Sequence, residues 1–147
     1  MEIVLKFKDE WVEEYGAKNR LIPAWIYLQH EGKCYPDDDW IDNPTVLLGW
    51  WLHSVSDLLK GGEGQGISFM EGPFFVAAAL KGEDFILESE DSEISWVVNK
   101  LDMAKELMKV ANQAARKLHD TGLTELSENL NGGIKELKTV VKKLSKG

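Results

Sequence analysis

The stretch YPDDDWIDNPTVLLGWWL, residues 35–52, holds four aspartates and three tryptophans in eighteen positions. Asn43 and Pro44 divide it into two parts, because Asn can cap free backbone N–H groups and Pro is tolerated in the first turn of a helix. We therefore predict an acidic loop followed by a helix from about Pro44 to Lys60.

The predicted helix is apolar around most of its circumference in its first half, so little of that half can face water. We predict that the helix is central to the fold. Trp50 and Trp51 are then mostly structural, and His53 is a partly buried structural histidine.

Two strands are predicted before the acidic loop. EIVLKFK, residues 2–8, alternates apolar and more polar residues, which is typical of a strand. Residues 11–23 contain Gly, Asn and Pro and are expected to be a looser segment. AWIYLQHEGK, residues 24–33, is predicted to be a second strand that turns at Glu31-Gly32.

Four short strands and two helices are predicted after the central helix. The runs ISFM, FFVAAAL, DFILES and SEISWVV are separated by turn residues and indicate an antiparallel meander. From Lys100 the apolar period becomes helical and ends near Gly122, and a last helix is expected to break at Gly132-Gly133.

The order of these elements predicts an α+β fold, in which an antiparallel sheet of about five to six strands packs with the Trp-rich helix and the C-terminal helices. The 147 residues match the length of a single domain, residues 1–147. Within it, residues 1–99 form a mixed α/β acidic body with 7 basic and 19 acidic side chains, a net charge of -12. Residues 100–147 form a helical part with 10 basic and 6 acidic side chains, a net charge of +4.

Composition indicates the cellular compartment and the class of binding partner. The chain has a single cysteine, Cys34, a charged N-terminus and no apolar run of membrane-spanning length. These features favour the cytoplasm and a protein without a membrane partner. An acidic body repels phosphates, which disfavours nucleic acid as a partner and favours a basic protein.

The acidic loop admits three interpretations: a metal loop, a solvated turn that caps the helix, and a recognition loop. Clustered carboxylates suit Ca²⁺ or Mg²⁺, but Ile41 and Asn43 occupy positions where an EF-hand needs other residues. Asp39 and Asp42 flank Trp40 as a catalytic carboxylate pair would, yet no positioned nucleophile accompanies them. We predict no metal, no cofactor and no enzymatic activity.

Other reactive or glycine-rich features favour structural interpretations. The three histidines fall in separate elements without zinc-ligand spacing, and Cys34 is expected to behave as a small hydrophobe. KGGEGQGIS, residues 60–68, follows a helix rather than preceding one, so it is a flexible connection rather than a phosphate cradle. The C-terminal lysines are interpreted as a solvated helix face.

The pattern Tyr35-Pro36-x-x-x-Trp40-x-Asp42-x-Pro44-x-Val46-x-Leu48-x-Trp50-Trp51 resembles one found in small bacterial immunity proteins of polymorphic toxin systems. In length, acidity and order of elements the chain is similar to the cytoplasmic antidotes paired with LXG-type toxins. The resemblance implies a protein that binds and blocks the toxic C-terminal domain of a cognate toxin, often a nuclease. It supplies no catalytic residues.

The resemblance and the charge distribution predict a partner-binding surface that attracts a basic toxin domain. Its expected residues are all acidic: Asp37, Asp38, Asp39, Asp42, Glu31 and Glu71. Two alternatives stay open. One is a small ligand-binding domain or enzyme that uses a pocket in the Trp-rich core, and the other is an adaptor that docks through its C-terminal helices. The sequence leaves the oligomeric state open.

Overall fold

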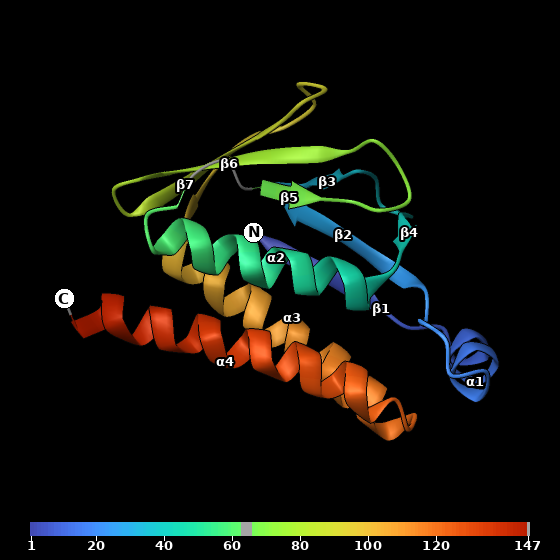
Figure 1. The fold of residues 1–147 in the computed structure, drawn as a ribbon. Helices are drawn as coiled ribbons and strands as arrows, with labels where there is room; N and C mark the ends of the chain where they lie inside the picture. The colour runs from blue at the N-terminus through green and yellow to red at the C-terminus, as the bar shows by residue number, and fades with distance from the viewer. Residues whose placement is uncertain (63–65, 147) are drawn as a thin grey trace.

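The computed structural model describes residues 1–62 and 66–146, in which the chain forms four helices and two antiparallel sheets of four strands each (Figure 1). The first sheet contains β1 (Glu2–Lys6), β2 (Ala24–His30), β3 (Lys33–Tyr35) and β4 (Ile41–Asp42), and β2 pairs with the other three. The second sheet is a meander of β5 (Gly66–Ser68), β6 (Phe75–Lys81), β7 (Asp84–Ser89) and β8 (Ser95–Asn99).

Three long helices pack with the sheets, and a short one connects β1 to β2. They are α1 (Asp9–Ala17), α2 (Pro44–Leu59), α3 (Lys100–Asp120) and α4 (Thr124–Lys146). In Figure 1, α2 lies between the second sheet and α4, and α4 packs against both α2 and α3. The structure confirms the predicted bounds of α2 and α3, the predicted turn after β2 and the predicted antiparallel meander.

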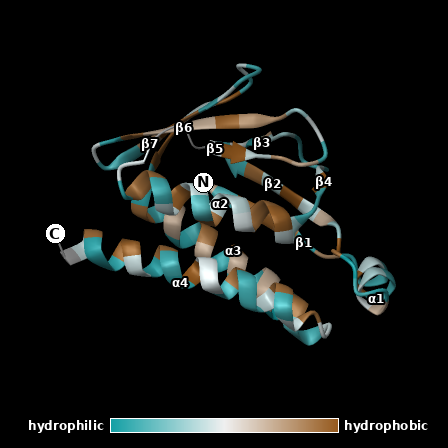
Figure 2. Ribbon diagram, viewed as in Figure 1, coloured by the Kyte–Doolittle hydropathy of each residue, from teal (hydrophilic) through white to brown (hydrophobic). Residues whose placement is uncertain are grey.

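The core gathers around α2, and hydrophobic residues, brown in Figure 2, are frequent along α2 and β2. Trp51 is fully buried and its Nε1 donates a hydrogen bond to the backbone oxygen of Ser68 at 2.8 Å. Ser54 donates in the same way to the backbone oxygen of Gly66 at 2.9 Å. These bonds attach α2 to β5.

Side chains of α3 bond to the outer edge of β1. The backbone N–H of Ile3 donates to Oε2 of Glu106 at 2.8 Å, and Nε2 of Gln113 donates to the backbone oxygen of Leu5 at 3.3 Å. An open strand edge offers unpaired backbone groups to other chains. The two α3 side chains occupy part of that edge.

The α+β class is confirmed, whereas the expectation of one sheet with five to six strands is wrong. Among the described residues, the strands before α2 pair only with one another, and the strands after it do the same. The buried helix stands between the two groups in the sequence and carries apolar residues on several sides, so each sheet can bury its inner face without joining the other. The predicted connection over residues 60–68 lies partly outside the described residues.

Two expectations about helices are also wrong. Residues 11–23 are not loose throughout, because they contain most of α1, whose first turn carries Asp9 and Glu10 at the end where acidic side chains stabilise a helix. The break at Gly132-Gly133 is absent, and α4 continues through both. A β-carbon on Gly133 would lie 3.1 Å from Cδ1 of Leu52, so this glycine permits a close approach to α2 whose packing outweighs its low helix propensity.

Candidate functional site

The loop between β3 and β4 exposes three of the predicted acidic residues in a defined conformation. Asp37, Asp38 and Asp39 are all exposed. Oδ1 of Asp37 accepts a hydrogen bond from the backbone N–H of Asp39 at 2.8 Å, and Oδ1 of Asp39 accepts one from Nε1 of Trp25 at 3.1 Å. Two of the three carboxylates are therefore oriented by bonds within the protein, which lowers the entropy that a partner would have to remove.

Asp42 does not project into solvent, contrary to the prediction, because its side chain is only 1% exposed. Its Oδ2 accepts hydrogen bonds from Nε1 of Trp40 at 3.0 Å and from the backbone N–H groups of Met70 and Glu71 at 3.0 and 3.2 Å. Its Oδ1 accepts one from the backbone N–H of Asn43 at 2.7 Å. Four donors surround this carboxylate, so it joins the start of α2 to the segment between β5 and β6.

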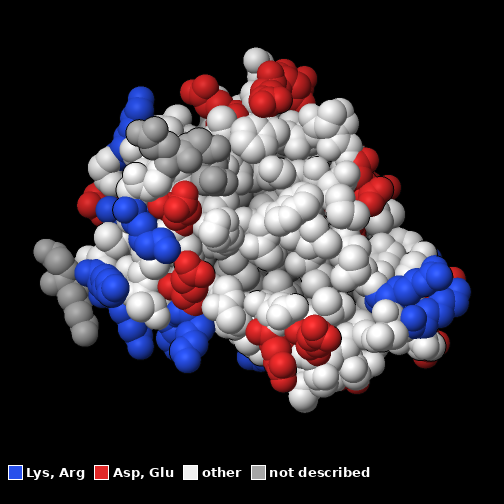
Figure 3. Space-filling view, in the orientation of Figure 1, with Lys and Arg blue, Asp and Glu red and all other residues white. Residues whose placement is uncertain are grey.

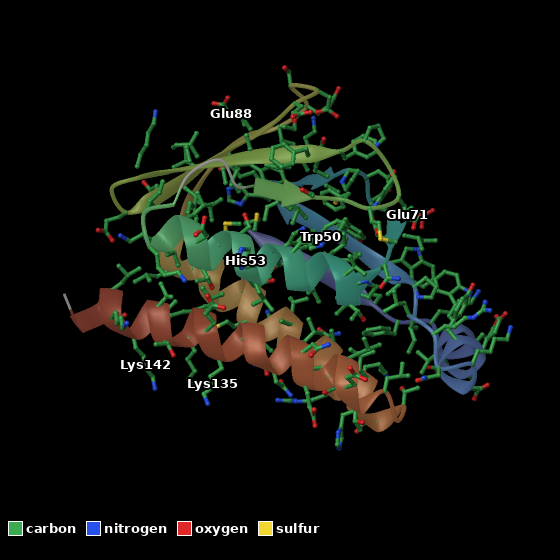
Figure 4. The ribbon with its side chains drawn as sticks, viewed as in Figure 1. Trp50, His53, Glu71, Glu88, Lys135 and Lys142 are labelled. Atoms are coloured by element: carbon green, nitrogen blue, oxygen red, sulfur yellow. The ribbon has the colours of Figure 1, made fainter. Side chains whose placement is uncertain are left out.

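Glu71 and Glu31 lie at different ends of the first sheet. Glu71 is exposed beside the buried Asp42, at the right of the view in Figure 4. Glu31 is exposed in the turn after β2, with Oε1 3.6 Å from Nε2 of His30. Asp42 pairs with Ala24 at the beginning of β2, so Glu31 at its other end is roughly 20 Å away along an extended strand. The fold brings Glu71 to the aspartate loop and leaves Glu31 apart.

Three further acidic residues join the loop through the turn between β7 and β8. Glu90, Asp91 and Glu93 are exposed there. Oδ2 of Asp91 accepts a hydrogen bond from the hydroxyl of Tyr35 at 3.1 Å, and Oε2 of Glu93 lies 3.3 Å from Nζ of Lys33. The sequence marks this segment as a turn, but no sequence signal places it beside β3.

We call the exposed acids of these three segments the acidic band. It comprises Asp37, Asp38, Asp39, Glu71, Glu90, Asp91 and Glu93. In Figure 3, acidic side chains lie in separate groups along the upper and right edges of the view and also at left of centre and at the bottom, and basic ones lie mainly at the left and the far right. The band is a discontinuous surface that only the folded chain assembles.

Two tyrosines behind the acidic band have raised pKa values. Burial, together with the hydrogen bond to Asp91, raises the pKa of Tyr35 to about 12. Burial also raises the pKa of Tyr27, and the charges of Cys34, Asp38 and Asp39 add to this effect. Both hydroxyls therefore stay neutral well into the alkaline range and add no negative charge to the band.

A pocket of about 480 Å³ opens between α1 and the junction of β4 with α2. Its lining residues are Trp11, Tyr15, Leu21, Pro23, Ile41, Asp42, Asn43 and Glu71. Asn43 begins α2 as predicted, but its side chain makes no capping hydrogen bond. Its Oδ1 is buried and has no hydrogen-bond partner among the described residues.

Trp50 and His53 lie at the surface of α2, and both structural predictions for them are wrong (Figure 4). Trp50 is 47% exposed, and His53 and Gly49 are exposed beside it. The centre of the face in Figure 3, over α2, carries few charges. The polar His53 was the signal that this side of the helix faces water, because it lies three residues after Trp50 and four after the small Gly49.

The described residues contain no group of three or more His, Cys, Asp or Glu arranged to hold a metal ion. His30 packs edge-on against Trp96, with ring centroids 5.4 Å apart, while His53 and His119 are exposed on separate helices. Cys34 is partly buried and unpaired. Among the helices of residues 1–62 and 66–146, none is long and apolar enough to cross a bilayer.

The C-terminal helix uses its apolar side within the fold. Leu130, Ile134 and Leu137 of α4 are buried in the core, whereas Lys135 and Lys142 point away from the sheets (Figure 4). The face that an adaptor would offer to a partner is thus already occupied by α2 and α3.

Comparisons with known proteins add no assignment: no protein family, curated protein or solved structure matches this chain.

Proposed function

We propose that this chain is an immunity protein, which binds the toxic C-terminal domain of a cognate bacterial toxin in the cytoplasm and blocks it through the acidic band. The observation that carries the proposal is the exposure of Asp37, Asp38 and Asp39 in a loop held by hydrogen bonds. These residues belong to the segment that resembles immunity proteins, and the band gives them acidic neighbours from two other segments.

The chemistry of such a toxin explains why the band would be acidic. A nuclease domain must be basic where it holds phosphates, and a preorganised array of carboxylates competes for that surface. Opposite charges also accelerate encounter, which matters for an antidote that must reach its toxin before damage occurs. The inhibitor needs no reaction of its own, so the proposal requires neither catalytic residues nor a cofactor.

The decisive experiment is the protection of cells that express the cognate toxic domain. A variant with Asp37→Asn, Asp38→Asn and Asp39→Asn should fold normally, because exposed charges contribute little to stability, yet should lose protection at low expression. The matched control neutralises three exposed acids outside the band, Glu88→Gln, Asp120→Asn and Glu128→Gln, and should protect fully.

Binding kinetics supply an independent readout. For the native pair, the association rate should fall steeply as salt rises, while the dissociation rate should change much less. Full protection by the folded triple variant would show that the acidic band is not the inhibitory surface. The uncharged face of α2 around Trp50 would then be the next surface to test.

A further inference from the structure

The pocket between α1 and the β4–α2 junction has a composition that selects among ligand classes. Its sides are formed by the side chains of Trp11, Tyr15, Leu21 and Pro23. The polar groups that line it are Asp42, Asn43 and Glu71, and no Lys or Arg is among its lining residues. Carboxylates repel a phosphate or a carboxylate ligand, so the pocket disfavours anions.

The exposed carboxylate of Glu71 disfavours a purely apolar ligand. It forms no ion pair with the described residues and lines the exposed side of the pocket. An apolar group that filled the pocket would displace water from this carboxylate without replacing its hydrogen bonds, whereas a ligand with N–H groups would replace them.

We propose that this pocket receives the side chain of an arginine from the toxin domain. A guanidinium group carries five N–H donors in one plane, stacks on aromatic rings and remains charged at all physiological pH values. It can therefore donate to Glu71 while its flat faces contact the ring side chains. The inference rests on the proposed function, because it takes the partner to be a basic protein domain.

Two neighbouring features fit this assignment. Nζ of Lys8 lies 5.2 Å from the centroid of the Trp11 ring, so this ring already attracts a cation of the chain itself. Asp42 adds negative charge beneath the pocket while its four hydrogen bonds keep it in place. The pocket also adjoins the acidic band through Glu71, so one partner surface can reach both.

The test uses N-acetyl-arginine amide as the probe and needs no toxin. The probe is titrated into the full chain while the indole signal of Trp11 and the side-chain amide signal of Asn43 are followed by NMR. We expect saturable shifts with a dissociation constant on the order of 1 mM. Glu71→Gln should weaken binding roughly tenfold, the effect of losing one charge-assisted hydrogen bond. Folding should survive, since only the backbone N–H of Glu71 is bonded to Asp42.

Controls separate the pocket from general acidity. Glu88→Gln removes the same charge from an exposed position of β7, distant from Glu71 in Figure 4, and should leave the affinity unchanged. Lys8→Met removes the competing ammonium group and should tighten binding two- to threefold, as expected for one exposed cation–π contact.

Three outcomes would overturn the inference: no saturation by roughly 50 mM probe, which is far above the expected constant; equal binding of the uncharged N-acetyl-citrulline amide; or tighter binding of N-acetyl-lysine amide. None of them bears on protection by the acidic band. If cells lose protection with the triple Asn variant but the arginine probe does not bind, the proposed function stands and the pocket assignment fails.

Discussion

Aspartates occur in opposite environments in two neighbouring regions: the loop between β3 and β4, and the junction between β4 and α2. Asp37, Asp38 and Asp39 are exposed, whereas Asp42 is 1% exposed and accepts four hydrogen bonds. The difference lies in the donors that the fold brings to each carboxylate, which charge counting does not reveal. An acidic cluster in a sequence can therefore combine a contact surface with the residue that holds the surface in position.

The same contrast between neighbours of one type occurs in α2. Trp51 is fully buried with its Nε1 bonded to Ser68, and Trp50 is 47% exposed. Successive helical residues point about 100° apart, so a helix at the edge of a core separates adjacent tryptophans into different environments. Pairs of this kind give matched variants, in which one member controls for the chemistry of the other.

The largest effect is expected for Trp51→Ala. Removing a fully buried indole should lower the free energy of unfolding by about 3–5 kcal/mol, because it leaves a cavity and an unpaired carbonyl oxygen. Trp50→Ala should cost no more than about 1–2 kcal/mol, since the side chain is half exposed. Denaturant unfolding of both variants measures the difference. Equal losses would contradict the assignment of Trp50 to the surface.

The next largest loss of stability is expected for Asp42→Asn. The amide cannot accept at both positions, so at least one of its four donors is left unpaired, and we expect a loss of about 2–3 kcal/mol. Asp39→Asn keeps an oxygen that can accept from Trp25 and should change stability by no more than about 0.5 kcal/mol. Chemical denaturation at constant pH compares the two. A neutral Asp42→Asn would show that the buried carboxylate does not hold the junction.

Local sequence patterns predicted most helices and strands, and the features that they missed depend on long-range contacts. The period of apolar residues located α2 and α3, and the turn residues located the hairpins of both sheets. No local pattern could show that β4, two residues long, pairs with the start of β2. The continuity of α4 depends likewise on the contact of Gly133 with Leu52, which lies in a different helix.

The sequence predicted those features of the candidate site that depend on residues close together in the chain. Exposure of Asp37, Asp38 and Asp39 follows from a polar run between strands, and the structure shows it. Burial of Asp42 required the backbone donors of Met70 and Glu71, which reach it only in the folded chain. The contribution of Asp91 and the pocket beside Trp11 depend on equally distant partners.

A pH titration tests the buried side of the acidic band, where the hydroxyl of Tyr35 donates a hydrogen bond to Asp91. The folded pKa of Tyr35 is raised from 10.0 to about 12, so the folded state retains a proton that the unfolded state has lost. Its stabilising contribution is complete below pH 10 and declines as the pH rises from 10 to about 12. The difference in unfolding free energy between the native chain and Tyr35→Phe should narrow over that range. A constant difference would place the hydroxyl in an environment like that of the unfolded chain.

The smallest effect is expected for the paired glycines of α4. A β-carbon on Gly132 meets no atom within 4 Å, so Gly132→Ala should stabilise the protein by about 0.5–1 kcal/mol through helix propensity alone. A β-carbon on Gly133 lies 3.1 Å from Cδ1 and 3.4 Å from Cβ of Leu52, and this crowding should cancel the gain. Thermal unfolding of both variants, with Lys135→Ala as an exposed α4 reference, measures the difference. If Gly133→Ala stabilised as much as Gly132→Ala, α4 would not approach α2 closely enough to require a glycine, and the unbroken helix would need another explanation.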